Sequence, residues 1–478
     1  MDWESLLSTE KLSPVEPEPT EFDNYPTNEF EKDYNRIVSS AAFRRLQDKT
    51  QVFPLDKSDF IRTRLTHSIE VSTIARQLGI MISKNKTPYR PTDIDPDIAE
   101  GISSVLLCAG LLHDLGNPPF GHFGETTIGD WFKSHLSIIE YKKRPLRDWL
   151  TEQMAKDLEN FEGNAQALRI LAKAKYGSAI NLSCGVISTL VKYPTNSCSF
   201  DRASKDIKQH KLGYFTAEED TLFSISQTVG TVDQNGDLCR HPLTFMLEAA
   251  DDIAYATADL EDAFKKRLFS LDSFIQFFEN SYDHSKIRAQ RSPERYSDRL
   301  INDLKARRLS AKDSAAFSSW LNHTRRWLMY VAVFRFSSSY QEIMSGAYQR
   351  DLFDDTYHQL SIKILKDAMP EFVFDSSSIL KLELSSQTIL SFLLDRFINA
   401  ALYYDPEYED RPNGYVQTKA NRKYMSIFSE NYKQDYEKAK THDEQNDLYL
   451  RLLMVTDFIS GMTDSYARTL YRELSGIE

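Results

Sequence analysis

The side chains best suited to chemistry in this sequence are gathered in the segment His113–Glu125, HDLGNPPFGHFGE. The segment holds two histidines, an aspartate and a glutamate, and it follows an apolar run, Val105–Leu112, that predicts a buried helix. Breaks at Gly116 and Pro118 end that helix and leave the His-Asp pair at the rim of a hydrophobic core. Ionisable groups there are costly to bury unless something pairs with them, and a metal ion is the simplest partner. The segment therefore favours metal-assisted hydrolysis.

Two further segments can bring ligands to the same point as His113 and Asp114. His67 lies near the first turn of a predicted helix in RTRLTHSIEVSTIARQLG. Asp251 lies in LTFMLEAADDIAYATADLEDA, which has no Gly or Pro and therefore favours a helix. Two imidazoles and two carboxylates suit a divalent cation, with coordination positions left for water and substrate oxygens. Carboxylate ligands suit Mn²⁺ or Mg²⁺, and the imidazoles also admit Co²⁺, Ni²⁺, Fe²⁺ or Zn²⁺.

Each part of this ligand set also has an ordinary structural explanation. A single histidine such as His67 is more often a helix-terminal or core residue than a ligand, and the pair Asp251-Asp252 is most often part of a solvated helix face. The combination is stronger than its parts because a helix break directly after His113-Asp114 is unusual. Spacing alone nevertheless supports a metal site and its absence about equally.

A second histidine, His122, lies across a Pro-Pro-Phe-Gly turn from His113, so a loop can fold it back over the same point. An imidazole with a usual pKa of about 6.5 gives or takes a proton near neutrality, and Glu125 can orient it. The structural alternative is a histidine on a surface loop. Arg64 offers a planar fork for phosphate oxygens and Lys192 a compact charge, although each alone is more often a solvated surface cation.

The composition describes a large, acidic globular protein. Its 478 residues exceed the size at which single cores usually stop growing, so one large domain with insertions or two intimate lobes is expected. The net charge of −12 argues against a generally basic nucleic-acid-binding surface. The start of the chain, MDWESLLSTEKL, is acidic, and no run of about 20 apolar residues predicts a membrane span. Four scattered cysteines without a CxxC pair indicate reduced thiols in a cytoplasmic protein.

The elements that must position these side chains are almost all helical. Apolar periodicity predicts helices over residues 33–46, 66–83, 97–112, 162–171, 179–191 and 243–264. The strand signal is limited to residues 228–243, where an Asn-Gly pair predicts one small β-hairpin. We expect an extended N-terminal arm over 1–28, a catalytic core over 29–265, an accessory helical lobe over 266–435, and C-terminal helices over 436–478 that return to the core.

The longer motifs resemble those of a known family. The pattern H…HD…D is the signature of the HD-domain metal-dependent phosphohydrolases. The strings SSAAFRRLQDKTQVFPL (39–55), HDLGNPPFGHFGE (113–125), EAADDIAYATADLEDA (248–263) and DFISGMTDSYA (457–467) look like bacterial dGTP triphosphohydrolases, within the wider dNTP triphosphohydrolases. The resemblance runs from about residue 34 to 264, returns at the C-terminus and is much weaker from 270 to 440. It implies an all-α fold with an HD-domain helical core and an accessory helical lobe.

Carried over position by position, the resemblance implies a complete active site. The implied metal ligands are His67, His113, Asp114 and Asp251. His122 would be the acid/base histidine and Glu125 its carboxylate partner.

The implied substrate-binding residues are Gln51, Arg64, Asn117, Lys192, Tyr193, Tyr255 and Asp259. In the family pattern Arg64, Lys192 and Tyr193 would hold the triphosphate. Tyr255 would pack against the deoxyribose, where a 2′-hydroxyl would clash, and Gln51 and Asp259 would bond the 3′-hydroxyl. The family cleaves between the 5′-oxygen and the α-phosphorus, which releases a deoxynucleoside and intact triphosphate and controls dNTP pools.

The resemblance also implies partners beyond the dGTP or dNTP substrate: a homo-oligomer, and an effector dNTP or single-stranded DNA. A cluster of Lys419, Arg422 and Lys423 beside Tyr415 and Tyr424 suits such a ligand, because a basic groove with aromatic platforms accommodates a strand. No membrane partner is expected.

Two other functional classes stay open from the sequence. One is a different HD phosphohydrolase, such as a 5′-nucleotidase or a (p)ppGpp hydrolase. The other is a non-catalytic nucleic-acid-binding regulator that keeps the fold, although the intact ligand set argues against it.

Overall fold

The computed structural model describes residues 1–13, 28–53, 60–85, 87–177, 180–289, 292–374, 377–404 and 417–477. Within these ranges the secondary structure is helical apart from isolated bridges and one two-stranded antiparallel sheet, β1 (Glu140–Tyr141) with β2 (Arg144–Pro145). The expectation of an all-α protein is confirmed. None of the helices in the described ranges combines the length and apolarity needed to span a bilayer.

In chain order, the helices before and after residue 270 make up two consecutive groups. The first group is α1 (Trp3–Leu6), α2 (Glu29–Ser39), α3 (Ala41–Arg44), α4 (Arg64–Ser83), α5 (Pro96–Leu112), α6 (His122–His135), α7 (Glu152–Glu159), α8 (Gly163–Ala172), α9 (Cys184–Leu190), α10 (Glu219–Thr228), α11 (Pro242–Ala254) and α12 (Leu260–Lys265). The second group is α13 (Leu271–Asn280), α14 (Pro293–Arg308), α15 (Asp313–Ser338), α16 (Tyr340–Met344), α17 (Gln359–Met369), α18 (Ser377–Ala401), α19 (Lys419–Met425), α20 (Glu430–Ala439), α21 (Glu444–Ser460) and α22 (Asp464–Ser475).

The candidate site is built on α4, α5 and α11, which pack against one another inside the larger of two hydrophobic cores. Small residues let α4 and α5 approach closely: a Cβ atom on Gly110 of α5 would lie 2.4 Å from the Cα atom of Ser72 in α4. Around this crossing the side chains are buried aliphatics such as Ile74, Leu78 and Leu106. Because the three helices are fixed by apolar packing, the polar residues on their facing surfaces are held in place.

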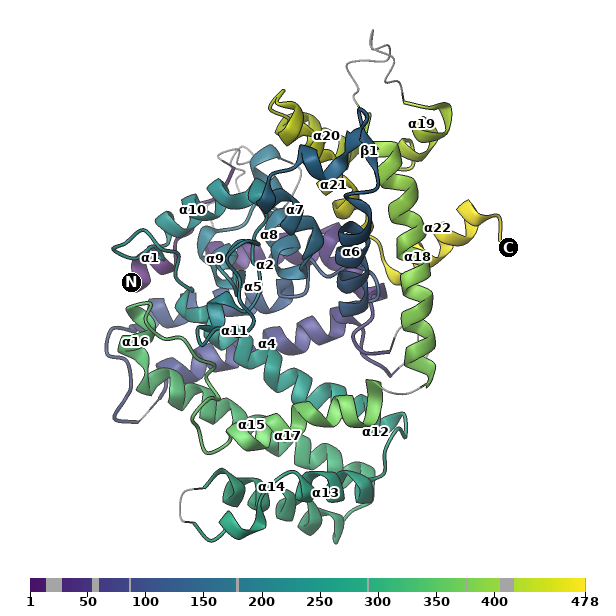
Figure 1. Ribbon diagram of the computed structural model, residues 1–478. Helices are drawn as coiled ribbons and strands as arrows, with labels where there is room; N and C mark the ends of the chain where they lie inside the picture. Colours follow the sequence, from purple (N-terminus) through teal and green to yellow (C-terminus); the bar gives the residue numbers. More distant parts are fainter. Residues whose placement is uncertain are drawn as a thin grey trace.

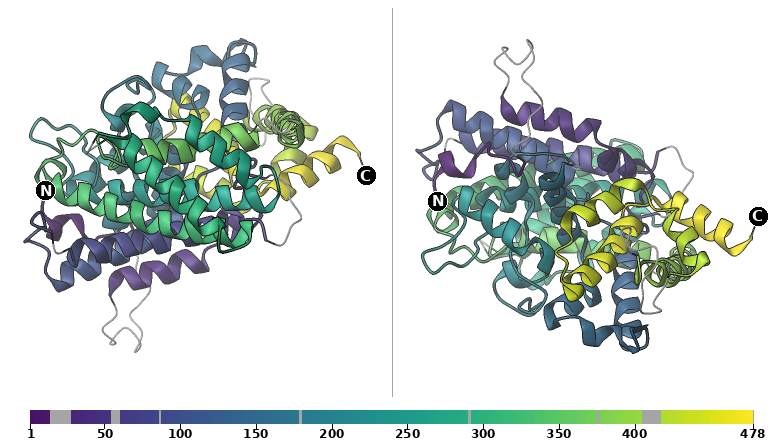
Figure 2. Two further views of the ribbon diagram at one scale, coloured as in Figure 1. Left: turned by 90° about the horizontal axis from the view of Figure 1, so that it is seen from below. Right: turned by 90° about the horizontal axis from the view of Figure 1, so that it is seen from above.

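The second hydrophobic core joins α6 and α7 to the C-terminal helices α18, α21 and α22. Figure 1 shows α18 as a long helix beside α6, with α22 crossing it. Helices α13, α14, α15 and α17 lie below the site helices in Figure 1. Of these, α15 packs on α4 and α11, and its rings Phe317 and Trp320 pack on Phe274 of α13. The two termini lie at opposite ends of the molecule (Figure 2).

Three predicted helices differ in detail from the structure. The segment predicted over 179–191 is helical, among its described residues, only in α9, Cys184–Leu190. The segment predicted over 33–46 divides into α2, α3 and a 3-10 turn, Arg45–Asp48, because the side chain of Ser40 caps a new helix. The segment predicted over 243–264 begins as α11, passes through a π-helical turn, Tyr255–Asp259, and ends as α12. Single π-helical turns are frequent at functional sites.

The predicted hairpin is present only as a turn closed by one antiparallel bridge, and the two-stranded sheet lies elsewhere. Residues 228–243 contain only a single bridge between Val232 and Leu238. The two-stranded sheet instead turns at Lys142 and Lys143, whose φ angles are 50° and 65°. Two successive left-handed residues give the tight turn that matches strand twist, but the pair Lys-Lys carries none of the Asn-Gly signal by which such a turn is recognised in a sequence.

The expected domain limits stay a prediction, and the described helices show how parts of the expected segments pack. Within the arm expected over 1–28, Trp3–Leu6 forms α1, and the buried Trp3 indole donates to the Tyr340 hydroxyl at 2.6 Å; residues 14–27 lie outside the described ranges. Among the described helices of the expected accessory lobe, α13 to α17 join the larger core and α18 joins the second core. The four cysteines are free thiols.

Candidate functional site

His113 ends helix α5 with one ring nitrogen fixed and the other unsatisfied. Its Nδ1 lies 2.8 Å from the carbonyl oxygen of Gly110, and since a carbonyl can only accept, Nδ1 must carry the proton. Nε2 therefore keeps its lone pair. This atom is buried without a hydrogen-bond partner, 3.5 Å from Asp251 Oδ1 and 3.5 Å from Asp114 Oδ2. Burial lowers the pKa of His113, which keeps the imidazole neutral.

His67 and Asp251 complete a compact cluster with His113. His67 lies in the first turn of α4, where Thr63 forms a capping box, and its Nε2 is 3.4 Å from Asp251 Oδ1. One ligand atom from each of the three side chains lies within 4.8 Å of the other two. Burial would raise the pKa of Asp251, but Lys192, whose Nζ donates to Oδ2 at 2.9 Å, and the histidines hold it well below its usual value.

This arrangement fits a divalent metal ion. A lone pair on His113 Nε2 and an ionised carboxylate oxygen of Asp251 face each other at 3.5 Å without a proton between them, which is unfavourable unless a cation lies among them. Imidazole nitrogen with carboxylate oxygen is also a donor set that first-row divalent ions accept. The cluster of His67, His113 and Asp251 could therefore hold the metal.

Asp114, the fourth expected ligand, lies beside this cluster but is engaged by other side chains. Its Oδ2 accepts from Arg64 Nη1 at 2.7 Å and its Oδ1 accepts from the Asn117 amide. Burial would raise the pKa of Asp114, but Arg64 and His113 keep it below its usual value. The structure thus brings three of the four expected ligands to one point and places the fourth at its edge.

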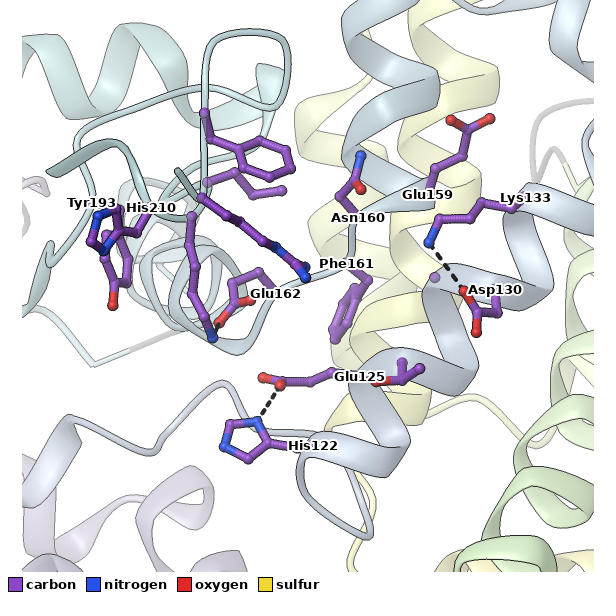
Figure 3. A pocket seen from close by; sticks show the side chains of 16 residues that line it. His122, Glu125, Asp130, Lys133, Glu159, Asn160, Phe161, Glu162, Tyr193 and His210 are labelled. Atoms are coloured by element: carbon purple, nitrogen blue, oxygen red, sulfur yellow. Dashed lines mark hydrogen bonds and ion pairs between the residues drawn. The ribbon is translucent and has the colours of Figure 1, made fainter. Parts of the chain in front are cut away.

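His122 and Glu125 form a hydrogen-bonded pair at the start of α6. Phe120 and Gly121 have φ angles of 65° and 62°, and this left-handed turn sends the chain back so that His122 begins the helix. His122 Nδ1 lies 2.7 Å from Glu125 Oε2 (Figure 3). Glu125 Oε1 accepts from the backbone N–H of Gly163 at 2.9 Å. The hydrogen bond to Glu125 raises the pKa of His122.

The residues expected to contact the sugar lie around the π-helical turn. Gln51 Nε2 donates to Asp259 Oδ2 at 3.4 Å, while Gln51 Oε1 and Asp259 Oδ1 are buried without partners. Burial raises the pKa of Asp259 to about 7. Tyr255 opens the turn and is half-buried. Each of these two unpaired oxygens can accept the proton of a hydroxyl group.

Every residue that the sequence analysis assigned to the site lines one cavity of about 580 Å³. The same cavity is lined by Glu162 and Asn164, which the sequence places only in a packing and capping element near the site, and by Lys211 and Lys366, which it does not single out. Lys211 Nζ donates to Glu162 at 2.8 Å, and Lys366 Nζ lies 2.6 Å from Asp252. The motif FEGNA contains Glu162 and Asn164 and could have pointed to them, whereas Lys211 and Lys366 stand in segments without a local signal.

A second cavity, also of about 580 Å³, adjoins the first and is lined in part by the His122–Glu125 pair (Figure 3). The two cavities share His122, Glu125, Glu162, Tyr193 and Lys211. The side chain of His122 therefore borders both cavities.

The basic cluster proposed for an effector lies away from both cavities. Lys419, Arg422 and Lys423 are exposed on α19, and the ring of Tyr424 packs on Phe397 with centroids 5.9 Å apart. Tyr415 lies outside the described residues.

Comparison with known proteins gives this geometry a family context. A family model described as HD domain matches residues 64–187, which span α4 to α9 and contain His67, His113 and Asp114. A protein of Listeria monocytogenes named deoxyguanosinetriphosphate triphosphohydrolase-like protein is 42% identical over 457 residues, 94% of each chain.

More distant relatives also align over nearly the whole chain. A Synechocystis protein with the same name is 32% identical over 489 residues and covers both chains completely. A Klebsiella pneumoniae protein named deoxyguanosinetriphosphate triphosphohydrolase is 32% identical over 492 residues, 94% of each chain.

Proposed function

The chain belongs to the deoxyguanosinetriphosphate triphosphohydrolase family of HD-domain hydrolases, and from this premise we propose that it hydrolyses dGTP, and other dNTPs, to a deoxynucleoside and inorganic triphosphate. The observation that carries the proposal is the convergence on one cavity of a metal-binding cluster, a His–Glu pair and a set of cations. Through this reaction the enzyme would control dNTP pools.

The metal ion is proposed to be Mn²⁺ or Mg²⁺, held by His67, His113 and Asp251 with Asp114 beside them. When bound, such an ion supplies Lewis acidity at the α-phosphate and lowers the pKa of water. Lys192 stabilises the ionised form of Asp251 by donating to Oδ2, and Arg64 does the same for Asp114. These two cations keep the carboxylates charged despite their burial.

His122 is proposed to manage the proton of the leaving group. Its Nδ1–H is tied to Glu125 Oε2, so Nε2 is the nitrogen that can deliver a proton to the 5′-oxygen as the bond to the α-phosphorus breaks. Glu125 stabilises the imidazolium and fixes the ring plane, since its second oxygen is anchored by the backbone N–H of Gly163.

The remaining residues are proposed to bind and select the substrate. Arg64, Lys192 and Tyr193 would hold the triphosphate, together with Asn117 at the edge of the cluster. The unpaired oxygens of Gln51 and Asp259 would receive the 3′-hydroxyl. Tyr255 would pack against C2′ and leave no room for the 2′-hydroxyl of a ribonucleotide.

The test is a product assay with the four dNTPs, GTP, dGMP and (p)ppGpp, with Mn²⁺ or Mg²⁺ and with a chelator. We expect intact triphosphate from dGTP, little from GTP, and none after chelation. Pyrophosphate or orthophosphate as the product would refute the proposed bond cleavage. Preferred turnover of dGMP or (p)ppGpp would move the protein to another class of HD hydrolase, and unchanged behaviour of His122→Ala would indicate a non-catalytic role.

A cytoplasmic location, a homo-oligomer and an effector dNTP or single-stranded DNA bound near Lys419, Arg422 and Lys423 are further proposals that rest on the resemblance. Light scattering after gel filtration and nucleotide titration of a Lys423→Glu variant would test the last two.

A further inference from the structure

The motif DFISGMTDSYA, residues 457–467, takes no part in the cavity described above. It covers the end of α21 and the start of α22, and none of its residues lines the cavity. Residues of the motif nevertheless make hydrogen bonds to segments that line the cavity.

Asp464, the first residue of α22, makes hydrogen bonds to two segments that are far apart in the sequence. Its Oδ2 accepts from the backbone N–H of Thr50 at 3.0 Å and also bonds the Thr50 hydroxyl. Its Oδ1 accepts from the backbone N–H of Phe120 at 2.9 Å. The side chain is buried, at 2% exposure, so these bonds are shielded from competing water.

Each of the two segments leads directly into the cavity. Thr50 precedes Gln51, whose amide contacts Asp259. Phe120 is a left-handed residue, and it is followed by Gly121 and His122. A non-glycine residue at a φ of 65° is strained and needs support from its surroundings. The hydrogen bond from its N–H to Asp464 supplies such support.

Lys49 ties the same parts together a second time. Its Nζ is buried and donates to the backbone oxygens of Ser460, at the end of α21, and of Asn117, in the loop after His113-Asp114. The C-terminal motif is thus joined to the catalytic loop at two places. Lys49 links Ser460 to Asn117, and Asp464 binds the backbone of Phe120.

We propose that Asp464 is a positioning residue that holds two parts of the active site in register: the Gln51 segment, which receives the sugar, and the turn that aims His122. It touches neither substrate nor metal in the proposed reaction, and it acts through the backbone of Thr50 and Phe120. The inference rests on the proposed function, because Gln51 and His122 take their roles from it.

A carboxylate is needed at this position because donors converge on both of its oxygens. Asparagine has nearly the same size but offers one acceptor oxygen and an NH₂ group, so one of the two backbone N–H groups would face another donor. One of the two segments would then be released. Misplacing reacting groups by about 1 Å can cost about 100-fold in rate, so the effect on turnover is expected to be large.

The test compares four variants of the full-length protein. Asp464→Asn releases one segment, and Thr50→Val removes only the hydroxyl bond to Asp464 on the Gln51 side. Gln51→Ala sets the scale for loss of the sugar contact. Asp435→Asn is the matched control, since Asp435 is also a buried carboxylate of the C-terminal helices, but it pairs with Lys173 at 3.5 Å and lies outside the catalytic cavity.

The assay measures triphosphate release from dGTP and from 2′,3′-dideoxyguanosine triphosphate, which lacks the 3′-hydroxyl, together with the thermal midpoint. We expect Asp464→Asn to lower kcat for dGTP by about 10- to 100-fold. We also expect it to reduce the preference for dGTP over 2′,3′-dideoxyguanosine triphosphate to a level near that of Gln51→Ala. Thr50→Val should reduce the preference while kcat stays within about threefold. Asp435→Asn should keep kcat and preference even where its thermal midpoint falls.

Several results would overturn the inference. Wild-type kcat in Asp464→Asn would do so, as would an equal loss of kcat in Asp435→Asn, which would indicate general destabilisation. If Asp464→Asn does not fold, Thr50→Val provides the test. A preference for dGTP over the dideoxy analogue that equals that of the wild type would then contradict the inference. A wild-type protein that releases no triphosphate from dGTP refutes the proposed function, and the inference with it.

Discussion

Replacing Glu125 by glutamine should move the alkaline limit of activity to lower pH. Glu125 Oε2 lies 2.7 Å from His122 Nδ1, and this contact raises the pKa of the imidazole. A glutamine can still accept from the Gly163 N–H through its oxygen, so the loop contact at 2.9 Å survives. Its NH₂ group cannot accept from His122, and the imidazolium loses its partner.

The size of the shift follows from the exposure of the histidine. The His122 side chain is 78% exposed, so solvent screens the pair and we assign it about 1 kcal/mol. An energy of about 1 kcal/mol changes an equilibrium constant about fivefold, so the pKa of His122 should fall and the imidazole of the variant should lose its proton more readily. Activity that requires the protonated imidazole is present below this pKa and is lost as pH rises through it. A lower pKa thus moves the alkaline limb to lower pH.

The measurement is the pH dependence of kcat for triphosphate release from dGTP at saturating metal and substrate. Asp130→Asn is the control, because Asp130 is on the same helix and pairs with Lys133 in solvent. Its alkaline limb should coincide with that of the wild type. An alkaline limb that stays in place in Glu125→Gln, or moves to higher pH, would show that His122 does not act as the proton donor.

Three further predictions concern the metal, the sugar and the core. Asp251→Asn should weaken Mn²⁺ binding measured by calorimetry by more than about 100-fold, since even outer residues of metal sites are worth about 10- to 100-fold; unchanged affinity would exclude Asp251 as a ligand. Tyr255→Ala should raise kcat/KM for GTP relative to dGTP by about tenfold, because a steric clash of about 1 to 2 kcal/mol is removed; an unchanged ratio would contradict the role of Tyr255. Gly110→Ala should lower the free energy of unfolding by about 1 to 3 kcal/mol, measured by denaturant titration, because its Cβ would lie 2.4 Å from Ser72 Cα; full stability would contradict the close helix crossing.

The part of the site that regular helices carry could be predicted from the sequence. Asp251, Tyr255 and Asp259 follow one another at intervals of four residues, and this spacing alone places them on one slowly drifting helical face. In the structure all three side chains line one cavity. The π-helical turn that begins at Tyr255 changes the angle by which successive residues rotate around the helix axis. Such a turn has no simple sequence signal, so its position could not be foreseen.

Residues that reach the site from distant segments could not be found in this way. Lys366 comes from α17 and pairs with Asp252, and Lys211 comes from an irregular loop and pairs with Glu162. Asp464 acts from α22 on segments more than 340 residues earlier. Lys366 and Lys211 stand in ordinary local sequence, and although Asp464 belongs to the motif DFISGMTDSYA, its contacts arise only from tertiary packing, which periodicity does not report. The same reason explains why the break between the two hydrophobic cores at α18 was missed.

The end of α5 shows how a local sequence feature can determine the chemistry of a metal ligand. A helix leaves its last four carbonyl groups without intrahelical partners, and because α5 ends at Leu112, the carbonyl of Gly110 is one of them. His113 satisfies it through Nδ1–H, and this bond turns the Nε2 lone pair toward His67 and Asp251. If the helix continued past Gly116, that carbonyl would be engaged by the backbone and the tautomer would no longer be fixed. The glycine and proline residues that follow the His-Asp pair therefore do more than make a loop, because the helix end that they impose selects the nitrogen that faces the metal.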